Sequence, residues 1–203
     1  MFPAMPNFPT YRARKARRPD TDECSVVKFL IGEGVNPGSI VSALALAREN
    51  ARTVRDFIPR EAWEQVNELH MYAKQNLASG LGHRWRHDYS RGIILGVQQI
   101  TGVLAGTMLH DDGYSFLRMG RNLERADMTI RIVDVRSDNL LPAQSEVLTP
   151  FENIQWMSVL KSLSAYQMYR RSQQVRVRRP DVLRFLLQER RYPRAFYHTI
   201  CEV

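Results

Sequence analysis

The chain has 203 residues, 44% of them hydrophobic, and a formal net charge of +8 at pH 7. It is long enough to bury a full hydrophobic core, and its apolar fraction is that of an ordinary globular protein. Its two cysteines, Cys24 and Cys201, lie far apart without a paired motif, which excludes a disulfide framework and a cysteine-based metal site and favours a reducing compartment, the cytoplasm.

Residues 1–22 are predicted to be a disordered, basic, proline-rich leader in front of a helical domain over 23–203. The first 18 residues contain three prolines, five basic side chains and no acidic one, a composition that does not favour a packed core. No apolar stretch follows a basic start, so the segment lacks the pattern of a secretory signal. Residues 19–160 hold more acidic than basic side chains, so a nucleic acid is not the partner we expect.

The first long helix is predicted over 37–58. Asn36 has the character of an N-cap and Pro37 suits the first helical position. Pro59 should end the helix, because proline in a helix interior costs about 3 kcal/mol. The apolar stripe recurs every three or four residues and consists of Ile40, Leu44, Ala47, Ala51, Val54 and Ile58.

The second helix is predicted over 59–77 and a polar loop over 78–88. Their sequences are "PREAWEQVNELHMYAKQNL" and "ASGLGHRWRHD". The helix should bury one stripe of side chains at helical spacing. These are Trp63, Val66, Leu69 and Ala73.

The third helix, over 89–109, contains glycines at four-residue intervals. Small residues at this spacing permit close approach of a neighbouring helix, so we expect this helix to be central. A membrane span needs roughly 20 apolar residues, and this run is shorter and interrupted by Gln98 and Gln99. We therefore expect a buried helix of a soluble protein and no membrane insertion. The glycines are Gly92, Gly96, Gly102 and Gly106.

The fourth helix is predicted over 116–136, followed by a loop over 137–148. Thr149 to Glu152 forms a capping-box sequence with proline at the first helical position, which opens a helix to about Arg171, and a short helix follows Pro180. No alternating strand pattern of useful length occurs, so we expect an all-α fold, a bundle of long antiparallel helices. The apolar stripe of the fourth helix is Phe116, Met119, Leu123, Ala126, Ile130 and Val133.

A faint internal repeat relates the two ends of the chain. "VVKFLIGEGVNPGSI", residues 26–40, aligns without gaps on "VLRFLLQERRYPRAF", residues 182–196. The repeat indicates an internal duplication. The second copy stops where a long helix should begin, so we expect the fold to be truncated at its C-terminal end.

The strings "ALARENARTVRDFIPREAWEQVNELH" and "GYSFLRMGRNLERADMTIRIVDV" resemble the Alpha-E domain family, bacterial all-helical proteins named for a Glu-Arg motif. The resemblance covers about residues 26–202. An earlier Glu-Arg helix typical of the family has no counterpart here, which implies truncation at the N-terminal end also. The family's second "GR-x-x-ER-A" motif matches Gly120, Arg121, Leu123, Glu124, Arg125, Ala126 and Asp127.

The resemblance implies partners rather than a reaction. Genes of the family tend to neighbour those of circularly permuted ATP-grasp proteins and transglutaminase-like peptidases. It therefore suggests a non-enzymatic part in a peptide ligation or modification system. An open alternative is an amide-bond or transferase enzyme that uses Glu124 with Arg125. A third is nucleic-acid binding through the basic ends, which would weaken steeply with salt.

Glu124 and Arg125 are expected to point to different sides of their helix, because successive residues differ by about 100°. Arg121 could pair with Glu124, and Asp127 with Arg131. One interpretation is an interhelical salt-bridge network that fixes helix register, with a similar segment as its partner. The other is a polar groove that binds an anionic or peptide ligand through Arg121 and Arg125. The candidate partner residues are Arg48, Glu49 and Arg52.

The sequence predicts neither a metal site nor a cofactor. His83 and His87 have a spacing that could bind a metal from a helix, but they lie in the predicted loop and have no evident third ligand. No Gly-rich phosphate loop or nucleophile elbow occurs. Because both truncations would leave apolar stripes uncovered, we expect self-association or a bound partner.

Overall fold

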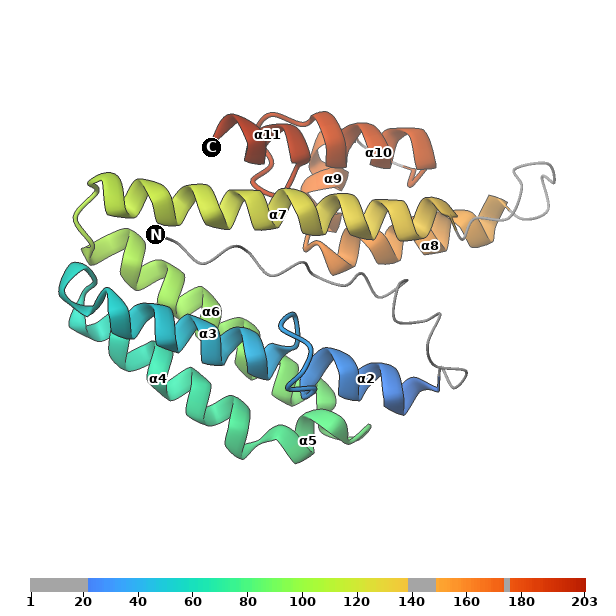
Figure 1. Cartoon of the computed structure of the whole chain (residues 1–203). Helices are drawn as coiled ribbons and strands as arrows, with labels where there is room; N and C mark the ends of the chain where they lie inside the picture. Colours follow the sequence, from blue (N-terminus) through green and yellow to red (C-terminus); the bar gives the residue numbers. More distant parts are fainter. Residues whose placement is uncertain (1–21, 139–148, 174–175) are drawn as a thin grey trace. The chain divides into compact units, whose positions relative to one another are not determined.

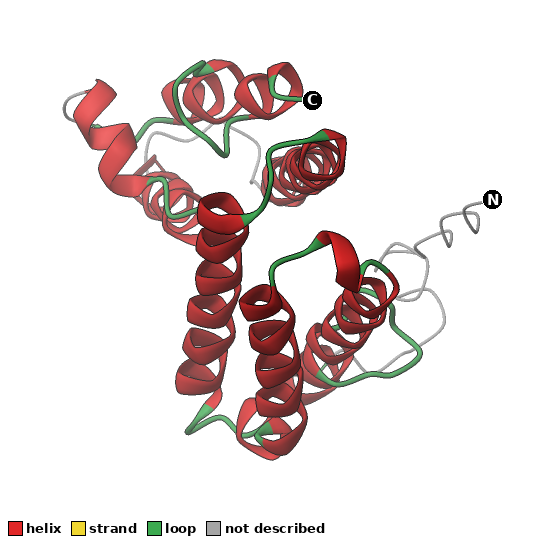
Figure 2. Ribbon diagram, turned by 90° about the vertical axis from the view of Figure 1, so that its left-hand side faces the viewer, coloured by secondary structure: helices red, strands yellow, loops and turns green. Residues whose placement is uncertain are grey.

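The computed structural model describes residues 22–138, 149–173 and 176–203. The predicted leader, apart from Asp22, and most of the loop at 137–148 lie outside them. The described residues form ten α-helices and one short 3-10 helix, with no strand among them (Figure 2). The predicted all-α fold is therefore confirmed. The chain divides into two compact units: unit 1 ends at Leu109, and unit 2 begins at His110. Over the described residues, no helix combines the length and apolar character that a membrane span requires.

Unit 1 is a group of helices in which α4 packs against both α3 and α6, while α2 packs on α5 (Figure 1). Its core is centred on Leu69 and Ala73 of α4 and on Tyr89 and Ile93 of α6. The elements are α2 (Glu23–Ile31), α3 (Ile40–Thr53), η1 (Arg55–Phe57), α4 (Arg60–Gln75), α5 (Leu77–Leu81) and α6 (Arg86–Thr107).

Helix α3 begins three residues later than predicted and ends sooner. Ser39 is its N-cap, and its side chain accepts a hydrogen bond from the backbone N–H of Ser42 at 3.2 Å. The Asn36 side chain instead binds the connecting turn, because it accepts from the Gly38 N–H and donates to the Phe29 carbonyl. The assignment of Asn36 and Pro37 to the helix start was wrong, and the helix stops at Thr53 before η1.

The predicted α4 stripe is largely confirmed, since Val66, Leu69 and Ala73 are buried. Trp63 is only half-buried and Ala62 takes the inner position. The predicted loop after α4 is partly helical: it contains α5, and α6 already begins at Arg86.

The glycines of α6 differ in how closely other side chains approach them. A Cβ at Gly92 would lie 2.3 Å from the Tyr72 hydroxyl oxygen, and one at Gly96 would lie 2.5 Å from a Leu69 methyl carbon, so these two positions do permit close approach of α4. Gly102 and Gly106 have no atom within 4 Å of a built Cβ. Only Tyr89 and Ile93 of α6 are buried. Ile94, Leu95 and Val97 are exposed in the described structure, so the expectation of a buried helix was wrong for most of α6.

Unit 2 is built on one long helix, α7, which contacts α8 and α11, while α10 contacts α8, α9 and α11 (Figure 1). Trp156, Leu160, Val182 and Leu186 are fully buried at the centre of its core. The elements are α7 (Asp112–Asp138), α8 (Thr149–Ser162), α9 (Tyr166–Gln173), α10 (Arg179–Gln188) and α11 (Phe196–Cys201).

The single helix predicted from Thr149 to Arg171 is two helices. Ser164 has a positive φ of 54°. The N–H groups of Ser164 and Ala165 donate to the carbonyls of Lys161 and Leu160 at 3.0 and 2.7 Å, the pattern of a Schellman helix end. The chain therefore turns between α8 and α9 without the glycine or proline that would have marked the turn in the sequence.

The repeat predicted from sequence is reproduced in the backbone. In the first copy, the Ser39 N–H donates to the Asn36 carbonyl and the Ala43 N–H to the Ser39 carbonyl. The equivalent bonds of the second copy run from Ala195 to Tyr192 and from Thr199 to Ala195. The helix starts also correspond: α2 and α3 begin at Glu23 and Ile40, α10 and α11 at Arg179 and Phe196.

Candidate functional site

The helix that carries the Glu-Arg motif, α7, does not bury the face that its apolar pattern predicts. Of the predicted stripe, Ala126 and Val133 are buried, whereas Phe116, Leu123 and Ile130 are exposed. The prediction that Leu123 faces the core was wrong. The buried side chains of α7 are Tyr114, Asn122, Ala126, Thr129 and Val133.

Polar contacts with the C-terminal part of unit 2 account for this orientation. The Asn122 amide donates to the Glu202 carbonyl at 3.3 Å, and the Thr129 hydroxyl donates to the Arg194 carbonyl at 2.9 Å. The Arg118 guanidinium pairs with the Glu202 carboxylate. Buried polar groups are stable only where they are hydrogen-bonded, so α11 and the turn before it select the polar side of α7.

The two residues of the Glu-Arg pair have different surroundings, as the helical wheel predicts. Glu124 is exposed, and Arg125 is half-buried and interacts electrostatically with Arg194 in the turn before α11. Burial lowers the pKa of the Arg125 guanidinium below its ordinary value, and the neighbouring charges of Arg121 and Arg194 lower it further. The glutamate of the motif is thus exposed to solvent, whereas its arginine is partly buried.

Arg121, Arg125 and Arg194 form a cluster of like charges, which we call the arginine cluster. Arg121 and Arg125 lie one turn apart on α7, and Arg194 lies in the turn between α10 and α11. No ion pair joins any of the three to a carboxylate within the part of the chain that the structure describes.

The acids of unit 2 that form ion pairs do so with other arginines. Asp127 pairs with Arg131 at 2.7 Å, as the sequence predicted. Glu189 pairs with Arg191 and Glu202 with Arg118, and Asp181 lies 3.8 Å from Arg184. The other predicted local pair, Arg121 with Glu124, is not among the ion pairs of the described residues, so that prediction was wrong.

One donor of the arginine cluster is orphaned. The Nε of Arg121 is buried and has no hydrogen-bond partner in the described structure. Tyr192 lies beside the cluster, and its hydroxyl donates to the Leu163 carbonyl at 2.7 Å; burial raises the pKa of this hydroxyl, while Arg194 and Arg125 lower it. Tyr192 is therefore an uncharged neighbour of the arginine cluster and offers no negative charge to it.

The candidate residues of unit 1 are satisfied locally. Glu49 pairs with Arg52 on the same helix at 2.6 Å, and Arg48 Nε donates to the Asn67 amide oxygen at 2.6 Å. The guanidinium of Arg48 also lies 5.8 Å from the ring centre of Trp63. A network between these residues and the Glu-Arg pair would join the two units and stays a prediction.

Sequence reasoning missed Asn122, Thr129 and Arg194. The first two had a signal in the sequence, a polar stripe with the period of a helix face. The stripe consists of Arg118, Asn122, Arg125 and Thr129, at intervals of 4, 3 and 4. Arg194 had none, since nothing in its turn indicates that it lies beside a helix 69 positions earlier.

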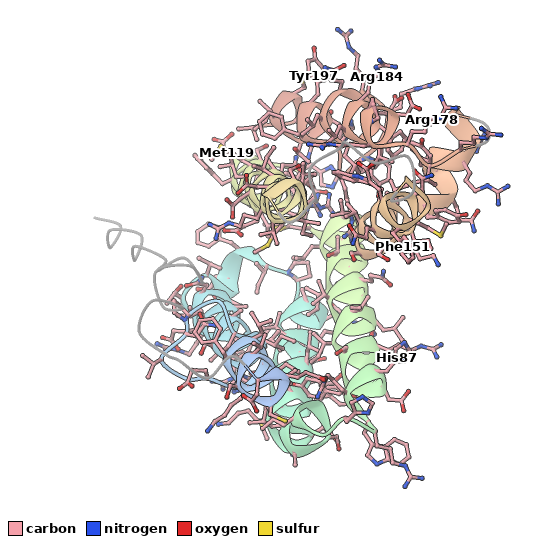
Figure 3. All side chains as sticks on the ribbon, turned by 90° about the vertical axis from the view of Figure 1, so that its right-hand side faces the viewer. His87, Met119, Phe151, Arg178, Arg184 and Tyr197 are labelled. Carbon is pink, nitrogen blue, oxygen red and sulfur yellow. The ribbon has the colours of Figure 1, made fainter. Side chains whose placement is uncertain are left out.

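The histidines do not form a metal centre in the described residues, where no group of three His, Cys, Asp or Glu side chains lies close enough to hold an ion. His87 does lie on a helix, the first turn of α6, and its side chain projects away from the ribbon (Figure 3). Its nearest acid is the adjacent Asp88 at 3.9 Å.

Comparison with known proteins gives one match. The family model of Alpha-E, described as a predicted alpha-helical domain with a conserved ER motif, matches residues 4–203. The match begins inside the stretch predicted as a leader. No curated protein and no solved structure matches the chain. The matched family and the all-helical fold agree with the motif on α7, and the chain belongs to the Alpha-E family.

Proposed function

We propose that this Alpha-E protein is a non-enzymatic, cytoplasmic partner in a bacterial peptide ligation or modification system. Its partner in this proposal is a circularly permuted ATP-grasp protein, with a transglutaminase-like peptidase as a second component. The contact surface is the outer face of α7, which we define as Phe116, Leu123, Glu124, Met128 and Ile130. The observation that carries the proposal is the exposure of this face on the helix that bears the family's motif.

The outer face has the composition of a protein-binding surface. Phe116 is 68% exposed, Met128 52% and Leu123 45%, and the exposed Glu124 carboxylate stands among them. Large apolar and aromatic side chains around a few charges are typical of the energetically dominant part of protein interfaces. An exposed motif acid can supply specificity by pairing with a cation of the partner.

The geometry favours this role over an enzyme that uses Glu124 and Arg125 on one substrate. Glu124 is exposed, whereas Arg125 is half-buried beside Arg121 and Arg194. A general acid or base must lie within hydrogen-bond reach of the same reacting group as its catalytic partner. Two side chains on different sides of one helix do not meet that condition.

The proposal can be tested with purified proteins. The ATP-grasp and transglutaminase-like proteins encoded beside the gene in the native host are immobilised, and binding of the full chain is measured by biolayer interferometry. Leu123→Ser and Glu124→Lys are each expected to weaken binding to the ATP-grasp protein at least tenfold, about 1.4 kcal/mol. Leu46→Ser is the matched control, because Leu46 is 52% exposed on α3.

Two outcomes would contradict the proposal. The first is that neither protein binds the full chain at micromolar concentrations. The second is that Leu46→Ser weakens binding as much as Leu123→Ser does, which would mean that the outer face of α7 is not the contact. If Glu124→Gln instead abolished a turnover that the wild-type chain catalyses, without changing its thermal stability, the enzyme alternative would replace this proposal.

A further inference from the structure

Three arginines of unit 2, Arg121, Arg125 and Arg194, interact electrostatically. None of them has a counter-ion among the described residues. Arg121 and Arg125 lie four residues apart, so both project from the same side of α7. Arg194 is held beside them because its carbonyl accepts the Thr129 hydroxyl at 2.9 Å. The hydrogen bonds that seat this turn on α7 thus also bring its arginine toward the other two.

We propose that the arginine cluster is a binding site for a small oxyanion that carries at least two negative charges, such as a phosphate monoester or a polycarboxylate. This site is separate from the proposed contact face of α7 and does not depend on the proposed function. Arginine suits both ligand types because its planar fork donates two parallel hydrogen bonds to carboxylate or phosphate oxygens.

The repulsion inside the cluster supports the proposal. Like charges that share a partly buried site disfavour one another. Burial lowers the pKa of Arg125 most, and the charges of Arg121 and Arg194 lower it further. The fold keeps the three together although Arg118 and Arg131 on the same helix are both paired with acids. A bound dianion would remove the repulsion at little structural cost.

The orphaned donor supplies a second, independent argument. A buried N–H without an acceptor is destabilising, and the Nε of Arg121 is buried without one in the described structure. An oxyanion seated between Arg121 and Arg125 would provide this acceptor. The Tyr192 hydroxyl donates to the Leu163 carbonyl and makes no hydrogen bond to this donor in the described structure.

The test uses the full chain and three probes at one ionic strength, adjusted with sodium chloride. The probes are inorganic phosphate, citrate and acetate, and binding is measured by isothermal titration calorimetry and by the shift in thermal midpoint. We expect saturable binding of phosphate or citrate, with acetate at least tenfold weaker. Tighter phosphate binding would assign a phosphate ligand to the site, and tighter citrate binding a polycarboxylate.

Variants of the arginines distinguish a defined binding site from attraction by the net positive charge of the protein. Arg125→Gln and Arg121→Gln should each lower the affinity at least tenfold, whereas Arg131→Gln should leave it within twofold. Arg131 is the matched control because it lies on the same helix, carries the same charge and pairs with Asp127. Arg125→Lys retains the charge but not the fork, so it should fold like the wild type and bind with intermediate affinity.

The proposal is overturned if neither phosphate nor citrate binds saturably to the folded wild-type chain. It is also overturned if Arg131→Gln lowers the affinity as much as Arg125→Gln, because the binding would then follow net charge alone. Far-ultraviolet circular dichroism of each variant shows whether it is folded. If a glutamine variant does not fold, the wild-type titration and Arg125→Lys still decide the question.

Discussion

The Thr129 hydroxyl donates to the Arg194 carbonyl at 2.9 Å, although the two residues are far apart in the chain. Thr129 is 1% exposed and lies on the buried polar side of α7. This bond fixes the turn that precedes α11 and, with it, the backbone of one member of the arginine cluster. Loss of this hydrogen bond should therefore weaken both the packing of the turn on α7 and the binding of an anion.

Replacement of Thr129 by valine should destabilise the protein by about 0.5–1.5 kcal/mol, because the partly buried hydrogen bond to the Arg194 carbonyl would be lost. Thr129→Ser keeps the hydroxyl and loses only a methyl group, which costs about 1 kcal/mol. Urea unfolding curves of the two variants measure the difference. A valine variant as stable as the wild type would show that the hydrogen bond contributes nothing. Phosphate affinity should also fall in the valine variant and remain in the serine variant.

Ser164→Gly should stabilise the protein by about 0.5–1 kcal/mol. The positive φ of Ser164 costs an L-residue roughly 1–2 kcal/mol, and this strain outweighs the extra chain entropy that glycine loses on folding. The thermal midpoint measured by circular dichroism should rise. Ser164→Val is the opposite control, since a β-branched side chain suits this conformation least, and it should lower the midpoint.

Alanine in place of glycine should have opposite effects at two helical sites. At Gly80, a Cβ would lie 2.7 Å from the buried ring of Tyr89, and the overpacking should cost about 1–3 kcal/mol. At Gly102, no atom lies within 4 Å, so the higher helix propensity of alanine should stabilise by up to about 1 kcal/mol. Chemical denaturation of both variants tests the pair. A stabilised Gly80→Ala would contradict the close packing of α5 on α6.

The protein should lose stability as the pH falls below about 6.5, in part because of His70. Burial lowers the pKa of His70 from 6.5, with smaller contributions from Lys74 and Arg48. The unfolded chain therefore binds this proton at a higher pH than the folded chain does, so stability falls as the pH falls through this range. His70→Gln should flatten the dependence of the free energy of unfolding on pH between 7.5 and 5.5. An unchanged slope would assign the effect to other groups.

Helical periodicity was sufficient to predict the long helices, since 3.6-residue spacing is a property of local sequence, but it did not indicate the short helices α2, α5 and α11. It was not sufficient to predict which side of α7 is buried. That helix carries an apolar stripe through Leu123 and a polar one through Asn122 and Arg125, and the choice depends on hydrogen bonds to Glu202 and Arg194. Partners so distant in the chain leave no signal in a local pattern.

The helix boundaries were missed for a related reason. The break at Ser164 has neither glycine nor proline. The packing of Leu160 and Ala165, which are both fully buried, offsets the cost of the positive φ at Ser164. At the start of α3, Asn36 and Ser39 both have N-cap chemistry, and only the tertiary bond from Asn36 to the Phe29 carbonyl decides between them. For the candidate site, the sequence indicated Arg121 and Arg125 but could not indicate the third arginine.

Equivalent positions of the two repeated segments, 26–40 and 182–196, differ in burial and therefore in their tolerance of substitution. Leu30 and Leu186 are equivalent positions, yet Leu30 is 50% exposed and Leu186 is 0% exposed. Leu186→Lys should prevent folding, because it would bury an unpaired charge, whereas Leu30→Lys should change the free energy of unfolding by less than about 0.5 kcal/mol. At such equivalent positions, the same substitution is tolerated in one segment and not in the other. The matching backbone turns of the two segments thus do not require matching surroundings for their side chains.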